Sequence, residues 1–386
     1  MFYTKICVMR ERNILFYFRF PFLPTAGGVE RVSCVLGDWF SKHGYNVYYL
    51  SDVFSSERES IFVHDKVGLN DNENFEALKK FICERSIGII INQGAFFPTS
   101  KRLYELSSDG VKIISVVHNS LEAMYSHPSV PIKSPWAQSI LNTKLFSSLF
   151  RHYFYCKYHG FLKFMVMQSD KVVVLSKCYI KEIEKFACKS ENVVAIGNPV
   201  TLDLEQDNWE KENAVCFLGR LSWQKRPDLL LKIWSRMPNR DDWHLYIVGD
   251  GEMKHVLERM IKKEGLNNVS LEGYQDPKPY LRKSKIMCMT SVYEGFPLVL
   301  FEGMGYGLVP IAYDTFGSAK DIIKDGINGY LVNGFDTASY IARVSHLMNS
   351  PRSWNAMSSA AKRTASDNTV DKIGEKWIEL FKSLYN

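Results

Sequence analysis

Short apolar runs alternate with amphipathic stretches along most of the chain. In the first half, the runs that fit buried strands cover 13–18, 45–51, 87–92, 111–117 and 171–176, and a shorter run covers 193–200. Helical patterns lie between them, as over 28–43 and 74–85. The second half repeats this order with strand-like runs over 214–220, 244–250, 269–274, 285–291 and 308–314, and it ends in a helical stretch over 370–385. The alternation predicts an α/β protein with parallel sheets flanked by helices.

The break between the two halves is a polar, acid-rich stretch over 203–212, which has no apolar period. We therefore predict a Rossmann-like domain over 1–200, a linker over 201–213 and a second Rossmann-like domain over 214–369. The final helical segment, 370–386, is expected to pack back toward the first domain. Two such domains suggest an active site in the cleft between them, at the carboxyl ends of the strands.

Composition narrows the class of protein. With 386 residues, 46% hydrophobic and 23% charged, the chain is typical of a soluble enzyme and unlike a disordered or coiled-coil protein. No apolar run approaches the roughly 18–20 residues that span a bilayer. Arg10 and Arg12 lie where a signal peptide would need apolar residues, and the eight cysteines are scattered singly, so we expect a cytoplasmic protein. The net charge of +6 is too diffuse for a nucleic-acid binder, but it suits a phosphorylated substrate or a membrane surface.

The most informative segment runs from Ser291 to Met304. A strand is followed by the turn Glu294-Gly295-Phe296-Pro297 and then by a helix, whose first amides, at Leu298 and Val299, would offer free N–H groups to a phosphate. Glu302 lies eight positions after Glu294, roughly 12 Å along a helix axis. Paired glycosidase acids lie about 5–9.5 Å apart, so the two glutamates more plausibly bind different parts of one long ligand. The alternative is a solvated loop acid and an acid on a helix face.

A second segment, Phe217 to Asp228, places Arg220 and Lys225 just after a strand that ends at Gly219. A guanidinium and an ammonium are the usual pair for a diphosphate, and they would stabilise a diphosphate leaving group. The alternative is two surface cations near the start of a helix.

Two weaker signals lie in the first half. Gly27 and Gly28 stand between the first strand and the first long helix, where glycine lets backbone approach a ligand, although their spacing fits neither a dinucleotide fold nor a P-loop. His118 falls at the carboxyl end of a strand, where it could face the cleft or serve as a structural side chain. No Asp-x-Asp triplet occurs, so nothing suggests a metal-bound diphosphate, and we expect no metal.

The stretch 144–163 contains four basic residues, seven aromatic residues and no acidic residue. This composition favours a surface helix on an anionic membrane. The alternative is an aromatic core helix with a cationic outer face.

Together these segments resemble family 4 of the retaining glycosyltransferases, which have the GT-B fold of two facing Rossmann-like domains. The Glu294-x7-Glu302 pattern, the Gly219-Arg220-x4-Lys225 pattern and their order carry the resemblance, which is dense over about 214–335. The segment Gly27-Gly28-Val-Glu-Arg carries it more loosely in the first half. The later segment Asp325-Gly-Ile-Asn328-Gly also looks like the family's segment after the donor site.

The resemblance implies roles for these residues. Glu302 would hold the ribose hydroxyls of a nucleotide sugar, and Glu294 would contact the transferred sugar as a positioning group rather than a nucleophile. Arg220 and Lys225 would clamp the diphosphate with help from the amides of Gly28, Leu298 and Val299. His118 would lie beside the anomeric carbon, and the base would stack near Gly273, Tyr274 and Gln275. Such enzymes need no metal or other cofactor.

The implied function is transfer of a hexose or N-acetylhexosamine, with retention, from a nucleotide sugar that we expect to be UDP-linked. The acceptor would be a saccharide or a lipid-linked glycan in capsule or O-antigen synthesis, at the inner face of the membrane. Two alternatives stay open from the sequence. One is an isomerase of the UDP-sugar 2-epimerase kind, which shares the architecture. The other is a non-catalytic sugar-nucleotide binding protein.

Overall fold

The computed structural model describes residues 11–20, 22–23, 27–52, 68–122, 144–188, 190–203 and 209–386. These residues form two compact units. The first holds the described residues up to Leu121, those of Arg151–Thr201 and those of Val370–Asn386, and the second holds the remainder. Residues 204–208 of the predicted linker lie outside the described part of the chain.

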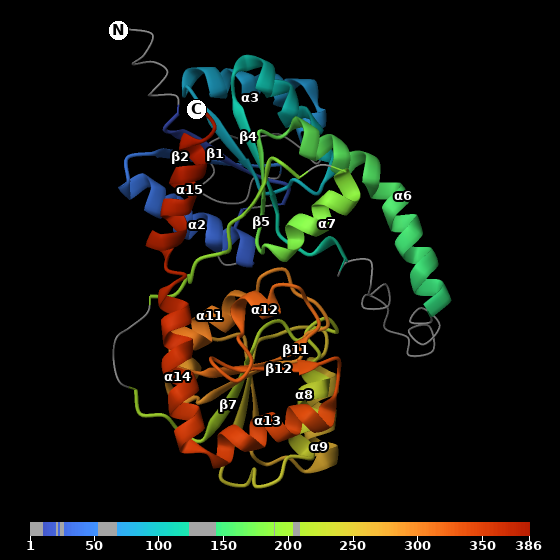
Figure 1. Ribbon diagram of the computed structural model, residues 1–386, viewed down its shortest axis with the longest axis vertical. Helices are drawn as coiled ribbons and strands as arrows, with labels where there is room; N and C mark the ends of the chain where they lie inside the picture. Colours follow the sequence, from blue (N-terminus) through green and yellow to red (C-terminus); the bar gives the residue numbers. More distant parts are fainter. Residues whose placement is uncertain are drawn as a thin grey trace. The chain divides into compact units, whose positions relative to one another are not determined.

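The first unit is built on a six-stranded parallel sheet in the order β2-β1-β3-β4-β5-β6 (Figure 1). Its strands are β1 (Asn13–Phe18), β2 (Asn46–Ser51), β3 (Ile89–Asn92), β4 (Lys112–Val117), β5 (Lys171–Val174) and β6 (Val193–Ala195). Its helices are α2 (Gly28–Lys42), α3 (Asn72–Glu84), α7 (Cys178–Ala187), α15 (Val370–Lys382) and most of α6 (Lys144–Gln168), with 3-10 segments η1 (Gly68–Asn70) and η2 (Pro98–Asp109). Every residue of β1 and β3 is buried, as expected for parallel strands covered on both faces.

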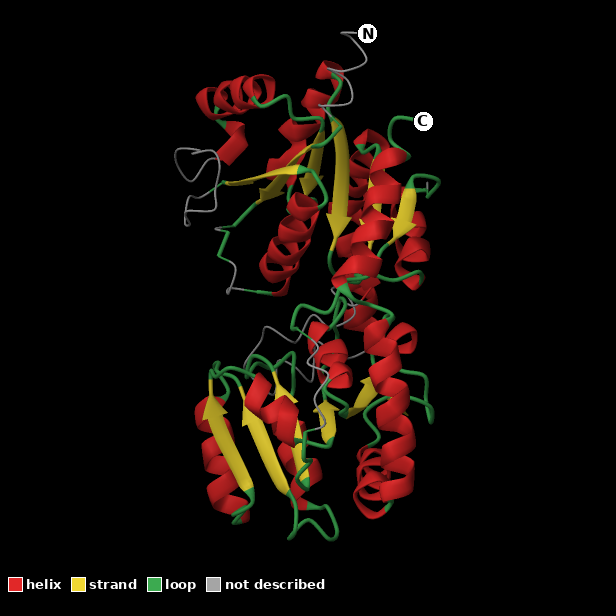
Figure 2. Ribbon diagram, turned by 90° about the vertical axis from the view of Figure 1, so that its left-hand side faces the viewer, coloured by secondary structure: helices red, strands yellow, loops and turns green. Residues whose placement is uncertain are grey.

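The second unit has another six-stranded parallel sheet, in the order β12-β11-β10-β7-β8-β9. Its strands are β7 (Ala214–Leu218), β8 (His244–Val248), β9 (Val269–Gly273), β10 (Ile286–Met289), β11 (Val309–Asp314) and β12 (Tyr330–Asn333). The helices are α8 (Pro227–Ser235), α9 (Lys254–Glu264), α10 (Lys278–Lys283), α11 (Leu298–Gly305), α12 (Ala319–Ile322), α13 (Thr337–Asn349) and α14 (Pro351–Ser366). Figure 2 shows strands of one direction between helices in each unit, so the predicted α/β fold with two Rossmann-like units is confirmed.

The C-terminal helix α15 packs on α2 within the first unit (Figure 1). Trp39 of α2 donates its indole N–H to Asp371 at 2.7 Å, and the rings of Phe40 and Phe381 lie 5.3 Å apart. A Cβ on Gly374 would lie 2.4 Å from the Trp39 ring, so only glycine permits this close approach. The last seventeen residues of the chain are thereby part of the N-terminal unit.

One strand, β12, differs from what the pattern of apolar residues predicts. Strand β12 is not evident in the sequence, because it has only four residues and follows the turn 325–329 directly. In that turn Asn328 is 2% exposed, accepts a hydrogen bond from the Lys324 amide and donates to the Ile322 carbonyl, so it holds the turn together. No helix among the described residues is long and apolar enough to cross a membrane.

Candidate functional site

Several of the predicted donor residues follow β7 and β10, the two strands at which the second sheet changes direction. Strands β7, β8 and β9 follow one another toward one edge, whereas β10, β11 and β12 follow one another toward the other. The loops after β7 and β10, two neighbouring strands, therefore diverge at their carboxyl ends. This topological switch point is where open α/β sheets bind ligands.

The structure joins these two loops through Lys225 and Glu294. The Lys225 ammonium donates a hydrogen bond to Glu294 Oε1 at 2.6 Å, and the two side chains are 20% and 8% exposed. A carboxylate this buried needs a cationic partner. Sequence reasoning assigned both residues to one ligand and did not foresee that they would pair with each other.

Hydrogen bonds to the backbone fix this pair in place. The hydroxyl of Thr290, which directly follows β10, is shared between the carbonyls of Lys225 and Arg226 at 3.0 and 2.8 Å. Gln224 donates its side-chain amide to the Tyr293 carbonyl at 2.9 Å, and its own carbonyl accepts from the Val292 amide. The two loops therefore behave as one body. Thr290 and Gln224 were missed from the sequence, where the available signal was a polar residue directly after β10 and another in the loop after β7.

Arg220 differs from Lys225 in being free to meet a ligand. It is exposed, and in the described part of the chain its guanidinium makes no hydrogen bond or ion pair. Its neighbour Gly219 has a φ of +150°, and a Cβ on Gly249, after β8, would lie 1.9 Å from the Gly219 carbonyl oxygen. Glycine at both positions lets the ends of β7 and β8 touch through backbone alone, which leaves Arg220 outside the packed layer.

Helix α11 brings the second glutamate to the same end of the sheet. Pro297 is its N-cap, so the first-turn amides of Leu298 and Val299 lack acceptors within the helix. Glu302 lies in this helix and is 1% exposed, and Glu294 in the loop before it is 7% exposed, so the loop acid is not a solvated one. The turn before the helix is tied down: Ser318 donates to the Gly295 carbonyl at 2.7 Å, and the ring of Phe296 stacks on that of Phe301 at 5.3 Å.

The predicted base-stacking segment follows β9. Gly273 has a φ of +70°, with open space where a side chain would be. Tyr274 is 75% exposed, and Gln275 is also exposed. An exposed tyrosine at the carboxyl end of a strand is able to stack on a planar ring.

The remaining predicted residues belong to the first unit. Gly27 caps α2 with extended backbone, so no left-handed conformation requires glycine there, and Gly28 begins the helix. His118 follows β4 and is half-buried, and its Nε2 lies 2.6 Å from Oε1 of Gln93, which follows β3. Burial lowers the pKa of His118 to about 4, so the imidazole is neutral at pH 7. Gln93 is a further residue that sequence reasoning missed.

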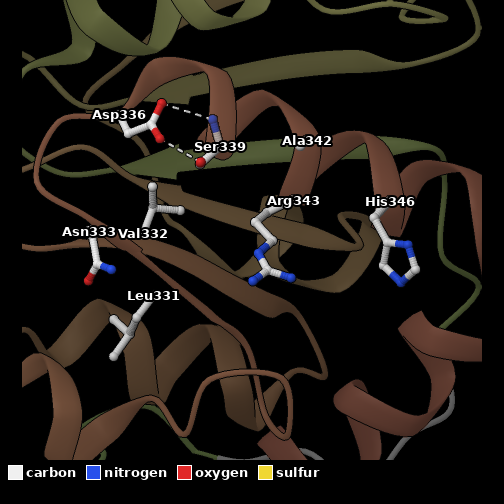
Figure 3. Close-up of a pocket in the computed structure, with 8 residues that line it drawn as sticks. All are labelled: Leu331, Val332, Asn333, Asp336, Ser339, Ala342, Arg343 and His346. Carbon is white, nitrogen blue, oxygen red and sulfur yellow. Dashed lines mark hydrogen bonds between the residues drawn. The ribbon is translucent and has the colours of Figure 1, made fainter.

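A pocket of the second unit contains none of the predicted residues. It has a volume of about 420 Å³ and lies between β12 and α13. Figure 3 shows Arg343 and His346 projecting from the same side of α13, while Asp336 accepts hydrogen bonds at the start of that helix. This pocket lies at the β12 edge of the sheet, away from the switch point between β7 and β10. Within the described residues, no three His, Cys, Asp or Glu side chains are grouped so as to hold a metal ion.

Comparisons with known proteins agree with this geometry. Residues 201–364 match the family model described as "Glycosyl transferases group 1". The amylovoran biosynthesis glycosyltransferase AmsD of Erwinia amylovora is 29% identical over 370 residues, which are 93% of this chain and 97% of AmsD. An uncharacterized glycosyltransferase of Haemophilus influenzae is 26% identical over 366 residues, covering 92% of this chain and 96% of the relative.

A solved structure shares the fold of the whole chain. The structure of Anabaena HepE in complex with UDP superposes with a TM-score of 0.70 at 16% identity, over 96% of this chain and 100% of HepE. The family match covers the unit with the joined loops, and the similarity to glycosyltransferases extends over nearly the full length. Residues 201–364 are therefore similar to the group 1 glycosyltransferases, the similarity to proteins named glycosyltransferases extends over nearly the whole chain, and the chain has the GT-B fold.

Proposed function

We propose that this glycosyltransferase moves a hexose or N-acetylhexosamine from a UDP-sugar to a saccharide or lipid-linked acceptor, with retention and without a metal ion. The observation that carries the proposal is the Lys225–Glu294 pair beside the free guanidinium of Arg220, at the switch point of the second sheet. Two cations at this point suit the diphosphate of the donor, which is the leaving group and develops negative charge. In this proposal Arg220 and Lys225 supply the positive charge that a metal ion supplies in metal-dependent enzymes.

The environment of Glu294 supports a positioning role. A carboxylate neutralised by an ammonium at 2.6 Å is a poor nucleophile, so we assign Glu294 to contact a hydroxyl of the transferred sugar. We therefore favour attack of the acceptor on the face that the diphosphate leaves, with a phosphate oxygen taking the acceptor proton. We assign Glu302 to the ribose hydroxyls and Tyr274, which is exposed, to stacking on the base.

Two similar proteins support UDP as the nucleotide of the donor and polysaccharide synthesis as the pathway. HepE is solved with UDP, and AmsD is named for biosynthesis of a polysaccharide, amylovoran. We therefore place the protein in surface polysaccharide synthesis, of the capsule or O-antigen kind, with UDP as the nucleotide. The relatives that match over nearly the whole chain are named glycosyltransferases, which favours glycosyl transfer over an isomerase or a non-catalytic binding protein.

A thermal-shift panel tests the donor. UDP, GDP, ADP and several UDP-sugars are added in the presence of excess EDTA. A ligand at a hundred times its Kd stabilises the folded state by about 2.7 kcal/mol, so we expect UDP and one UDP-sugar to raise the melting temperature. A response to GDP alone, or a response that requires Mg²⁺ or Mn²⁺, would contradict the proposal. The anomeric configuration of the product, read by NMR, tests retention.

We also propose that helix α6 contacts an anionic membrane at the inner face. Its 25 residues contain no acidic residue. One side packs into the unit through Phe161, Leu162, Met165 and Val166, whereas Phe146, Leu149 and Tyr153 are 39%, 60% and 57% exposed on another. The cations Lys157 and Lys163 are exposed, and the side chains of Lys144 and Arg151 lie outside the described residues. Exposed aromatic residues flanked by lysines are typical of interfacial helices.

Sedimentation with vesicles tests the membrane contact. We expect binding to vesicles that contain anionic lipid and a marked loss of binding in Lys157→Glu/Lys163→Glu. The matched control is Lys42→Glu/Lys80→Glu, which makes the same charge change on exposed lysines of α2 and α3. Equal loss in both variants, or no binding by the wild type, would refute the contact.

A further inference from the structure

A chain of hydrogen bonds connects the first helix to His118. The Ser33 hydroxyl of α2 donates to the Val29 carbonyl at 2.8 Å, and the Gln93 side-chain amide donates to the Ser33 oxygen at 3.1 Å. The other end of the Gln93 carboxamide, Oε1, lies 2.6 Å from Nε2 of His118. Ser33 is fully buried, and the Gln93 backbone amide donates to the Tyr17 carbonyl at 2.9 Å, so Ser33 and Gln93 are both held in place.

The number of protons that each side chain can donate fixes the direction of each hydrogen bond. The single hydroxyl proton of Ser33 goes to Val29, so the Ser33 oxygen must accept from an N–H group. The NH₂ of Gln93 therefore faces Ser33, and its carbonyl oxygen faces the imidazole. A carbonyl oxygen can only accept, so Nε2 of His118 must carry a proton.

The place of these hydrogen bonds in the first sheet indicates their function. In the first sheet, β1 and β3 are the strands at which the order changes direction. Gln93 directly follows β3, Ser33 lies in the helix after β1, and His118 follows the next strand, β4. The three residues thus span the switch point of the unit, the place where such a sheet binds its ligand.

We propose that Gln93 is a positioning residue that holds His118 as the Nε2–H tautomer, so that Nδ1 is the acceptor for a hydroxyl of the transferred sugar. The proposal rests on the proposed function and on the role that the family resemblance implies for His118, beside the transferred sugar. A neutral acceptor suits this place, because the transition state of glycosyl transfer carries positive charge at the sugar ring and a cationic imidazole would oppose it.

The tautomer is measured directly by ¹⁵N NMR on the full chain labelled at its nine histidines, with His118→Gln assigning the resonances. We expect the Nε2–H form in the wild type at pH 7. In Gln93→Met, which keeps the length of the side chain without the acceptor, we expect a mixture of tautomers. In Gln93→Glu the added charge is expected to raise the pKa of His118 by at least one unit. An Nδ1–H form in the wild type, or an unchanged tautomer and pKa in both variants, would overturn the proposal.

Kinetics then separates positioning from the function of the site. With the UDP-sugar found by the thermal-shift panel, we expect Gln93→Met to lower kcat at least tenfold while the affinity for UDP stays within twofold. A merely structural defect would lower UDP affinity or folded yield as well, and this result would contradict the positioning role. If the tautomer changes but kcat does not, the placement of His118 beside the sugar is wrong. The NMR result does not depend on activity, so the two failures are distinguishable.

Discussion

Breaking the Lys225–Glu294 pair tests whether it holds the two loops together. At 2.6 Å and an effective dielectric constant of about 20, the Coulomb attraction of two unit charges is about 6 kcal/mol before desolvation is subtracted. Charge-assisted hydrogen bonds retain about 1.5–3 kcal/mol of this. We therefore expect a coupling energy of about 2 kcal/mol between the two side chains.

The two single variants should differ. Lys225→Met leaves a carboxylate that is only 8% exposed without its cation, so we expect a loss of about 3 kcal/mol in unfolding free energy. Glu294→Gln leaves an ammonium that is 20% exposed and can turn toward water, so we expect a loss of about 1 kcal/mol. The double variant should lose about 2 kcal/mol, which makes it more stable than Lys225→Met alone.

Hydrogen exchange of amides in β7 and β10 reports the stability of the second unit by itself. The control is the same cycle on Lys112 and Asp170 of the first unit, a pair at 3.0 Å whose side chains are 32% and 24% exposed. We expect less than about 1 kcal/mol of coupling there. Equal losses in Lys225→Met and Glu294→Gln, together with a coupling below about 0.5 kcal/mol, would refute the reasoning.

Three further predictions follow from burial and close contacts. First, the lowered pKa of His118, about 4, means that the unfolded state binds a proton between pH 6.5 and 4 that the folded state does not. Unfolding free energy should therefore fall by up to about 3 kcal/mol across that range in the wild type and less in His118→Gln, measured by urea unfolding; identical slopes would contradict this. Second, Gly374→Ala should separate α15 from Trp39 and cost about 1–3 kcal/mol in the first unit, seen as faster hydrogen exchange in α2; unchanged exchange would argue against the packing. Third, Gly249→Ala should disrupt the backbone contact with Gly219 and weaken UDP binding. The control is Gly265→Ala, where a Cβ meets open space at a φ of +60°, which should lower the unfolding free energy by about 1 kcal/mol and leave UDP binding intact. Similar UDP binding by both variants would contradict the contact.

The strands were predictable from the sequence because most are continuous apolar runs. The apolar run over 13–18 coincides with β1. The predicted strand over 308–314 differs from β11, which covers Val309–Asp314, by one residue. Strand β12 was not, because its four residues include only a short apolar stretch and its pairing with β11 supplies the stabilisation. Local pattern carries little information about a strand that depends on its neighbour.

The residues of the candidate site were predictable from the sequence, but the hydrogen bonds between them were not. Lys225 and Glu294 are 69 positions apart, and Gln93 and His118 are 25 apart. Each pair meets because neighbouring parallel strands bring their carboxyl ends to the same edge, and strand order is a property of the tertiary fold. The sequence contains the residue types that bind a diphosphate, whereas only the fold shows that one cation is held by a carboxylate and the other is free.

Calorimetric titration with UDP tests the central claim most directly, that a nucleotide diphosphate binds the loops after β7 and β10. UDP is titrated into the wild type, Arg220→Ala, Lys225→Ala and the control Lys254→Ala, which removes a lysine from the start of α9. We predict one binding site per chain, a loss of at least tenfold in affinity for the first two variants, about 1.4 kcal/mol each, and an unchanged affinity for the control. No binding of UDP to the wild type, or equal affinity in all four proteins, would contradict the account.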